Sequence, residues 1–372
     1  MENVIVQPAP FVPTASEPAT APRARVLLSG MADDRELLRA AAELTRDLQR
    51  PNRWIYWPDA FGSAAVGYGA VAGAILAHSP WVALAWAVLA VLALYRAMLF
   101  IHEITHLNHA LLPGFRFMWN LLIGVPMMLP SFMYEGIHVQ HHTRVKYGTA
   151  EDPEYLPLAL MKPWSLPLFF FAAVLMPVGL ILRFGVLGPL SIVIPPLRRV
   201  VIERFSGLQM NPGYRRRPPE GEFARQWFWE ELGASLVAVA IIATTATGLL
   251  PLHALLIYLA VIAGVALLNQ ARTLVAHRWE NEGDPLTVTA QFLDSTNVPD
   301  GILPRLWAPV GLRFHALHHL LPSLPYHALA TAHERISGAF GDDSTYAKAN
   351  YPTLRGLLGR LFSSTMTRNT AN

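Results

Sequence analysis

The sequence predicts an all-α integral membrane protein, on the strength of three observations. Of the 372 residues, 53% are hydrophobic and only 15% are charged. Four apolar stretches come close to the roughly 20 residues that a helix needs to cross a bilayer. Tight, uncharged turns join these stretches in two pairs, and arginines gather on one side of them only. We therefore expect four transmembrane helices in two hairpins, with a cytoplasmic helical cap.

The composition also excludes several kinds of protein. The chain has no cysteine, which excludes disulfides, thiolate-bound zinc, cysteine-held iron–sulfur clusters and a catalytic thiol. Its net charge is only +3, and its basic residues form no nucleic-acid-binding surface, so we expect no nucleic-acid partner. The 14 histidines are the most unusual feature that remains.

The first structured element that the sequence predicts is an amphipathic cytoplasmic helix over residues 31–50. Residues 1–22 are rich in Pro, Ala, Thr and Ser and predict a mobile tail. Pro51 ends the helix. The apolar residues that recur at helical spacing within it are Leu37, Leu38, Ala41, Leu44 and Leu48.

The chain is expected to divide into three parts. Residues 1–53 form the mobile tail and the amphipathic helix, and residues 54–340 form the membrane domain. Residues 341–372 form a cytoplasmic C-terminal tail.

The predicted spans cover residues 61–79, 81–101, 233–250 and 252–270. The turn within each pair carries no Lys or Arg. By contrast, residues 23–53 and residues 198–225 hold seven arginines each. Because positive residues stay on the cytoplasmic side, both termini and the central loop are expected to be cytoplasmic. The expected location is a bacterial inner membrane.

Two further apolar stretches must each cross the membrane an even number of times. Residues 115–133 are too few for two crossings, so they are expected to be interfacial or re-entrant. Residues 164–197 are interrupted by several prolines and glycines. They fit either an interfacial pair of half-helices or one extra tight hairpin.

Nine of the 14 histidines fall in three tight groups. Their sequences are HEITHLNH from residue 102, HVQHH from residue 138 and HALHH from residue 315. In a helix, positions i, i+3 and i+4 share one face, so each group can direct its rings to one side. Each group also follows a span or an interfacial stretch on the predicted cytoplasmic side, so the three can meet at one membrane surface.

The number of imidazoles predicts two metal ions. Neutral imidazole is a good ligand for iron, zinc, copper or nickel. Eight or more converging imidazoles exceed what one ion of ordinary coordination number can bind.

The first group also contains the sequence H-E-x-x-H. In metalloproteases this motif supplies two zinc ligands and a glutamate that activates water. An intramembrane zinc metalloprotease with Glu103 as general base is therefore an alternative, although it leaves the second and third groups unexplained. A metal transporter is a further alternative, but its ligands would lie within the spans.

Together, the three groups resemble the histidine boxes of the membrane fatty acid desaturase and hydroxylase superfamily. The boxes stand here as HEITH, HVQHH and HALHH. The flanking sequences HLLPSLPY, from residue 319, and QFLDSTNV, from residue 291, also fit. The resemblance covers about residues 55–335.

This resemblance implies a pair of iron ions bound mostly by histidine. A further ligand from the segment after the last span is best matched by His277. His109 lies on the same helical face as His102 and is a candidate extra ligand. The candidate hydrogen-bonding neighbours of the ligands are Glu103, Glu135, Asp152, Glu154 and Asp294. The ligand positions that match are His102, His106, His138, His141, His142, His315, His318 and His319.

The activity implied is that of an O2-dependent oxidoreductase with two iron ions as cofactor and O2 as co-substrate. We expect a fatty acid (acyl-lipid) desaturase that introduces a double bond into a long acyl chain. The alternative is a lipid or carotenoid hydroxylase or ketolase of the same superfamily. The metals would carry the difficult chemistry, so no separate side-chain nucleophile is expected.

The expected partners follow from the same resemblance. A long-chain acyl lipid is the substrate, and membrane lipids surround the protein. The chain has no glycine-rich nucleotide-binding loop, cytochrome b5 motif or rubredoxin cysteine pair. We therefore expect a separate electron donor, a ferredoxin, a cytochrome b5 or a similar carrier, on the cytoplasmic face.

Overall fold

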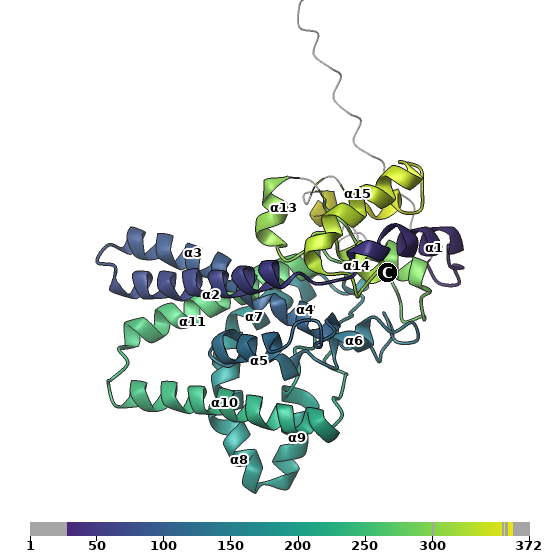
Figure 1. Ribbon diagram of the computed structural model, residues 1–372. Helices are drawn as coiled ribbons and strands as arrows, with labels where there is room; N and C mark the ends of the chain where they lie inside the picture. Colours follow the sequence, from purple (N-terminus) through teal and green to yellow (C-terminus); the bar gives the residue numbers. More distant parts are fainter. Residues whose placement is uncertain (1–27, 300, 352, 354–355, 360–372) are drawn as a thin grey trace, which may run out of the picture.

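The computed structural model describes residues 28–299, 301–351, 353 and 356–359 (Figure 1). Within these residues the regular structure is helical, accompanied by three isolated β-bridges. This confirms the predicted all-α class. The tail expected at residues 1–22 lies outside the described residues.

A short amphipathic helix, α1 (Arg35–Leu44), comes before the membrane domain. The Asp34 side chain caps it by accepting a hydrogen bond from the backbone N–H of Leu37 at 3.0 Å. The single helix expected over residues 31–50 is interrupted at Thr45, after which a 3-10 turn, η1 (Arg46–Leu48), continues the chain. The Thr45 hydroxyl bonds back to the carbonyl oxygen of Ala41 at 2.8 Å, which marks the end of the α-helix.

The two predicted hairpins are present. The first joins α2 (Arg53–Leu76) to α3 (Pro80–Met98), which leads directly into α4 (Phe100–His106). The second joins α10 (Gly221–Ala246) to α11 (Leu252–Leu274).

Helices α2 and α10 begin well before the predicted spans. The reason is that their first turns are polar or aromatic and do not count as apolar sequence, although they continue the same helix. Asn52, for example, caps α2 by accepting a hydrogen bond from the N–H of Trp54 at 2.9 Å.

Large apolar side chains cover the outside of these helices. Examples are Trp81, Leu84 and Leu236, which are 78%, 54% and 62% exposed. An apolar surface of this extent is unfavourable in water and fits a lipid environment.

The stretch at residues 115–133 forms no spanning helix. It consists of α5 (Phe115–Trp119), a π-helical turn η2 (Asn120–Gly124) and a 3-10 turn η3 (Ser131–Met133). The Asn120 amide donates to Ser131 Oγ at 2.8 Å and to the Glu230 carboxylate of α10 at 3.0 Å. These bonds fix the broken segment against α10.

Residues 165–193 differ most from the expectation. Helix α7 (Ser165–Leu182), the π-helical turn η5 (Arg183–Leu187) and α8 (Gly188–Val193) form one continuous helix. It is long and apolar enough to cross a membrane. The described residues therefore contain five such helices, and the predicted count of four is not confirmed.

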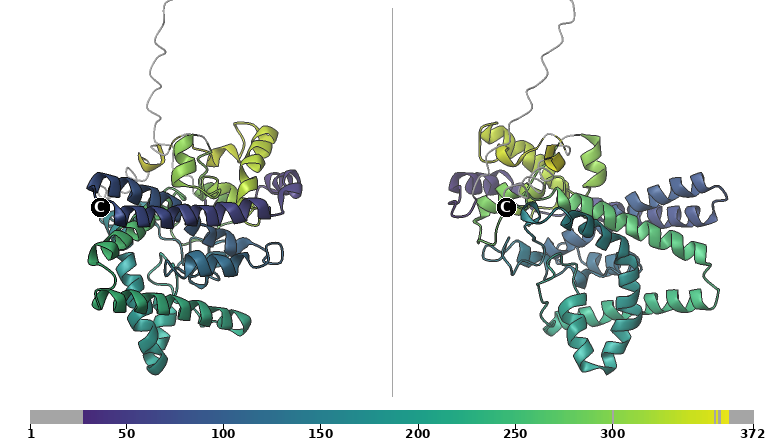
Figure 2. Two further views of the ribbon diagram at one scale, coloured as in Figure 1. Left: turned by 60° about the vertical axis from the view of Figure 1, so that its left-hand side comes forward. Right: turned by 180° about the vertical axis from the view of Figure 1, so that it is seen from behind.

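The prolines and glycines of this segment do not break it. Pro177 lies inside α7. Gly185 allows close packing against α10, since a Cβ there would lie 2.6 Å from Cδ1 of Ile242. After Ile194 the chain turns back as α9 (Pro195–Phe205), which packs along α8. Figures 1 and 2 show that this helical pair runs across α10 and α11 instead of alongside them.

The remaining short elements gather at the end of the hairpins opposite their turns (Figure 2). Residues beyond 340 take part in this cap, because Tyr346 is buried and the Asn297 amide donates to Asn350 at 2.9 Å. The cap elements are α6 (His138–His141), η4 (Leu158–Leu160), α12 (Val288–Asp294), α13 (Ile302–Trp307), α14 (His315–Leu320), η6 (Tyr326–Ala328), α15 (Leu329–Phe340) and η7 (Ala347–Ala349).

Candidate metal centre

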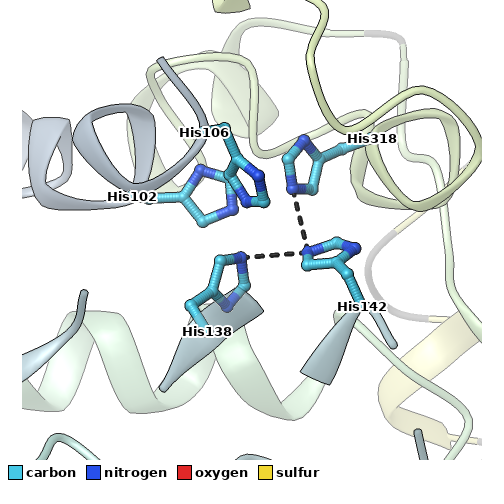
Figure 3. A group of neighbouring side chains, drawn as sticks. All are labelled: His102, His106, His138, His142 and His318. Carbon is cyan, nitrogen blue, oxygen red and sulfur yellow. Dashed lines mark hydrogen bonds between the residues drawn. The ribbon is translucent and has the colours of Figure 1, made fainter. Parts of the chain in front are cut away.

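Nine histidines converge in two adjacent groups, and the ligand atoms within each group lie within 4.8 Å of one another. The first group is drawn in Figure 3, where the rings face a common space from three separate segments. Two groups, each large enough to hold an ion, agree with the two metal ions expected from the sequence. The first group contains His102, His106, His138, His142 and His318, and the second contains His141, His277, His315 and His319.

The structure divides each H-x-x-H-H sequence between the two groups. On α6, the i and i+4 residues His138 and His142 join the first group, whereas His141 joins the second. On α14 the roles are reversed, because His315 and His319 join the second group and His318 joins the first. An i, i+4 pair lies on one line along a helix, and the i+3 residue is displaced to one side of that line. One short helix can therefore supply ligands to two neighbouring ions.

The imidazole nitrogens have the spacing of metal ligands. Nε2 of His138 lies 3.0 Å from Nε2 of His142, and Nε2 of His277 lies 2.9 Å from Nε2 of His315. Two nitrogens bound to one ion at roughly 2.1 Å and at right angles are about 3 Å apart. In addition, Nε2 of His102 and of His106 is buried without a hydrogen-bond partner. Metal coordination would satisfy these lone pairs.

Burial also keeps these rings in the form that binds metal. Loss of hydration, followed by repulsion from neighbouring imidazoles, holds the pKa of His138, His142 and His318 well below the usual value. The same causes lower the pKa of His315 and His319. Neutral imidazole is the metal-binding form, so little free energy is lost to deprotonation when an ion binds near neutral pH.

Carboxylates and hydroxyls fix the rings from behind. Nδ1 of His141 lies 2.9 Å from the Asp152 carboxylate, and Nδ1 of His138 lies 2.9 Å from the Glu154 carboxylate. A hydrogen bond of this kind places the proton on Nδ1 and leaves Nε2 free to bind the ion. Two predicted neighbours, Asp152 and Glu154, therefore do contact ligand rings.

A third predicted carboxylate, Asp294, reaches a ligand ring only through a tyrosine. The Tyr147 hydroxyl lies 2.9 Å from Nδ1 of His277 and donates to the Asp294 carboxylate at 2.8 Å. Asp294 is thus connected to the second group through a tyrosine. Burial raises the pKa of Asp294 to about 6, so this carboxyl is close to its titration range at neutral pH.

Comparison with known proteins agrees with this geometry. The family model described as "Fatty acid desaturase" matches residues 78–349, which include all three histidine groups and His277. The chain belongs to the fatty acid desaturase family. It is also 47% identical, over 339 residues, to a protein of Caulobacter vibrioides named "Ceramide hydroxylase", covering 91% of this chain and 96% of that protein. No solved structure matches the chain.

The similarity to the Caulobacter vibrioides protein helps to distinguish the two expected activities, desaturation and hydroxylation. The relative is a hydroxylase by name, which supports the hydroxylase alternative better than the expected desaturase. Family membership itself is shared by both activities.

The zinc protease reading of H-E-x-x-H does not fit this member of the desaturase family. A catalytic zinc keeps three protein ligands and an open position, whereas His102 and His106 lie among five imidazoles. Glu103 is also engaged in other contacts, since its carboxylate accepts hydrogen bonds from the Tyr56 hydroxyl and, at 3.1 Å, from the N–H of Tyr326. Its Oε1 lies 3.8 Å from Nδ1 of His102, so this predicted neighbour does approach a ligand ring. It holds α2 and η6 against α4 and is not directed to a metal-bound water.

Two other candidates of the sequence analysis lie away from the ligand rings. His109 is exposed and belongs to neither group. Glu135 pairs with Arg116 at 3.2 Å and accepts a hydrogen bond from Gln226 at 3.0 Å, so it supports the packing of α5 on α10.

Sequence reasoning missed three hydroxyl groups that touch ligand rings, those of Tyr134, Tyr147 and Ser295. Tyr134 precedes His138 by four positions, and this helical spacing could have identified it. Tyr147 and Ser295 reach His277 through loop geometry, which leaves no pattern in the sequence.

Proposed function

We propose that this chain is an O2-dependent hydroxylase of a ceramide-class lipid. The observation that carries the proposal is the similarity to the hydroxylase from Caulobacter vibrioides, which extends over nearly the whole length of both chains. The nine converging histidines support it, because they form two sites of the size that a pair of ions needs. A carotenoid substrate has no comparable support.

We propose that the two ions are iron. Their ligands would be the five histidines of the first group and the four of the second. When bound, the irons would supply the activation of O2 that oxidation of an unactivated C–H bond requires and that no side chain provides. In the overall reaction, one oxygen atom enters the C–H bond as a hydroxyl. The other leaves as water, with two electrons and two protons from outside.

The protein's own residues have three tasks in this reaction. Asp152, Glu154 and Tyr147 fix the ligand rings in position and in tautomer. Buried apolar residues around the centre, such as Phe100 and Leu317, exclude bulk water. The helices that enclose the centre must also hold the lipid with one carbon directed toward the irons.

The electrons would come from a separate carrier that docks beside α6. A surface pocket there is lined by three basic residues and one acidic residue, Lys146, Arg215, Arg217 and Glu151, together with Gln140. Gln140 lies on the outer side of the short helix that carries the ligands His138 and His141. If an acidic carrier bound in this pocket, only α6 would lie between it and the metal centre.

We further propose that four helices cross the membrane and that the metal centre faces the cytoplasm. The arginines at residues 23–53 and 198–225 support this sidedness. The pair formed by α7–α8 and α9 runs across the other long helices (Figure 2), a direction that suits a helix lying along the membrane surface.

The proposed function is tested by expressing the chain in a bacterium that makes ceramide, under isotopically labelled O2. Lipid mass spectrometry should show ceramide with one labelled oxygen atom added. Loss of two hydrogens without oxygen would instead indicate the desaturase. Unchanged ceramide, together with oxidised phospholipid acyl chains, would contradict the proposed substrate class.

A further inference from the structure

Arg272 is a buried cation that forms no ion pair within the described residues, although the Tyr95 hydroxyl is a hydrogen-bonding neighbour. It lies in the last turn of α11, and only 8% of it is exposed. One guanidinium nitrogen donates to Asn269 Oδ1 at 3.2 Å, but Nε has no hydrogen-bond partner among the described residues. Burying a charged group costs free energy unless hydrogen bonds and an opposite charge compensate for it.

The charges of the other buried arginines of the described chain are compensated, although Nη1 of Arg183 and Nε of Arg278 also lack a hydrogen-bond partner there. Arg183 pairs with Glu231 at 2.6 Å, and Arg278 pairs with Glu280 at 2.5 Å. Arg216 donates to two backbone carbonyl groups and stacks over Trp227. No ion pair of this kind forms at Arg272 within the described residues. Arg272 therefore keeps its Nε–H available for a further acceptor.

The position of Arg272 connects it to the metal centre. Burial, the neighbouring imidazoles and then the Arg272 guanidinium lower the pKa of both His277 and His315. The charge also acts on His102, so it lies near both groups of ligands. Metal ions in these groups would add further positive charge. The free-energy cost of the buried Arg272 charge would then rise, and a hydrogen-bond acceptor beside it would be more stabilising.

A row of polar groups leads from Arg272 to the outer surface. Tyr95 lies beside Arg272, and its hydroxyl donates to the backbone carbonyl of Trp307 at 2.9 Å. The indole Nε1 of Trp307 is buried and has no partner among the described residues. Two unpaired donors thus lie at the two ends of this row.

Trp307 ends α13, a short helix with an exposed apolar face. Ile302, Leu303 and Leu306 on this helix are 77%, 71% and 50% exposed. Exposed apolar residues of this kind, next to a membrane domain, suit contact with lipid. The unpaired indole N–H of Trp307 therefore belongs to the same short helix as a surface that suits lipid.

We propose that Arg272, with Trp307 as a second donor, binds the amide carbonyl oxygen of the lipid substrate. The inference rests on the proposed function, because it assumes a ceramide-class lipid. An amide carbonyl is a neutral, strong acceptor that can enter an apolar site without bringing a charge. Since Arg272 lies in the last turn of the helix that leads to His277 and its charge acts on the rings of His277 and His315, the carbon that becomes hydroxylated lies close to the amide, on either chain, and not in the middle of an acyl chain.

The test compares Arg272→Met with the exposed-site control Arg199→Met, both as purified iron-loaded enzyme. Equilibrium binding is measured without O2 for a ceramide and for the matched N-alkyl analogue, which lacks the carbonyl. Arg272→Met should weaken ceramide binding about tenfold or more, since hydrogen bonds to charged groups contribute this much. It should leave the iron content and the binding of the analogue unchanged.

Four results separate the possibilities. Equal loss of binding for both lipids, or loss of iron, would overturn the inference by showing a structural role for Arg272. Wild-type binding of ceramide by Arg272→Met would also overturn it. Fragment mass spectra that place the new hydroxyl in mid-chain would contradict the position of attack. The wild-type enzyme is assayed first. If it hydroxylates no ceramide at all, the proposed function fails, and the variants are not compared.

Discussion

The Asp152 carboxylate lies 2.9 Å from Nδ1 of His141, and both side chains are almost completely buried. Asp152 is itself fixed by the N–H groups of Gly148 and Glu154, each at 2.8 Å. Burial alone would lower the pKa of His141, but the Asp152 carboxylate outweighs this effect and raises it. The Asp152 carboxylate thus holds the proton on Nδ1 of His141 and orients the ring.

Replacing Asp152 by Asn should therefore weaken the second metal group. The amide cannot provide the same charge, and loss of such a partner typically lowers metal affinity by about 10- to 100-fold. Iron per chain, measured after dialysis against a weak chelator, should fall in Asp152→Asn. The neighbouring, exposed Glu151→Gln is the matched control. Equal iron content in both variants would show that Asp152 does not support metal binding.

The first histidine box offers a comparison within one segment. His106 joins the first group, whereas His109 is exposed and joins neither. His106→Ala should reduce both iron content and lipid oxidation, and His109→Ala should retain them. Metal analysis combined with lipid mass spectrometry checks both variants. Loss of iron in His109→Ala would mean that this ring reaches the centre in the working enzyme.

The sequence was sufficient to identify the histidines that converge, but not how they divide between the two groups. His138, His141 and His142 share one helical face, and that fact alone suggests a single point of convergence. The division appears only when α14 approaches α6 from another direction. Likewise, the apolar sequence at residues 164–197 did not reveal the continuous helix α7–α8, in which Gly185 and Gly188 allow close packing against α10. Long-range packing of this kind leaves no local pattern.

The basic pocket beside α6 should control reduction by the electron carrier. The double variant Arg215→Glu/Arg217→Glu should slow turnover with an acidic carrier by about tenfold or more at low salt, since electrostatic steering contributes at least this much. Single-turnover oxidation after chemical reduction should be unaffected. The exposed Arg39→Glu on α1 controls for net charge. If the double variant and Arg39→Glu have the same turnover rate with the carrier at every salt concentration, the carrier docks elsewhere.

The ion pair between Arg183 and Glu231 should contribute strongly to stability. Arg183 lies in the π-helical turn η5 and donates to the Glu231 carboxylate of α10 at 2.6 Å, while Arg198 of α9 donates to the same group at 2.7 Å. Glu231→Gln would leave the buried Arg183 without its counter-charge, and we expect the free energy of unfolding to fall by about 3–5 kcal/mol. Glu222→Gln removes the partner of Arg225 in an exposed pair on the same helix and should have little effect.

The measurement is thermal unfolding in a fixed detergent, with iron content recorded for each variant. A second variant, Arg183→Met/Glu231→Leu, removes both buried charges and should recover much of the loss, because the remaining partner, Arg198, has a side chain that is 33% exposed and can reach water. If Glu231→Gln unfolds at the same temperature as Glu222→Gln, the pair does not hold α7–α8 to α10. If the double variant is less stable than Glu231→Gln alone, the loss comes from packing and not from an unpaired charge.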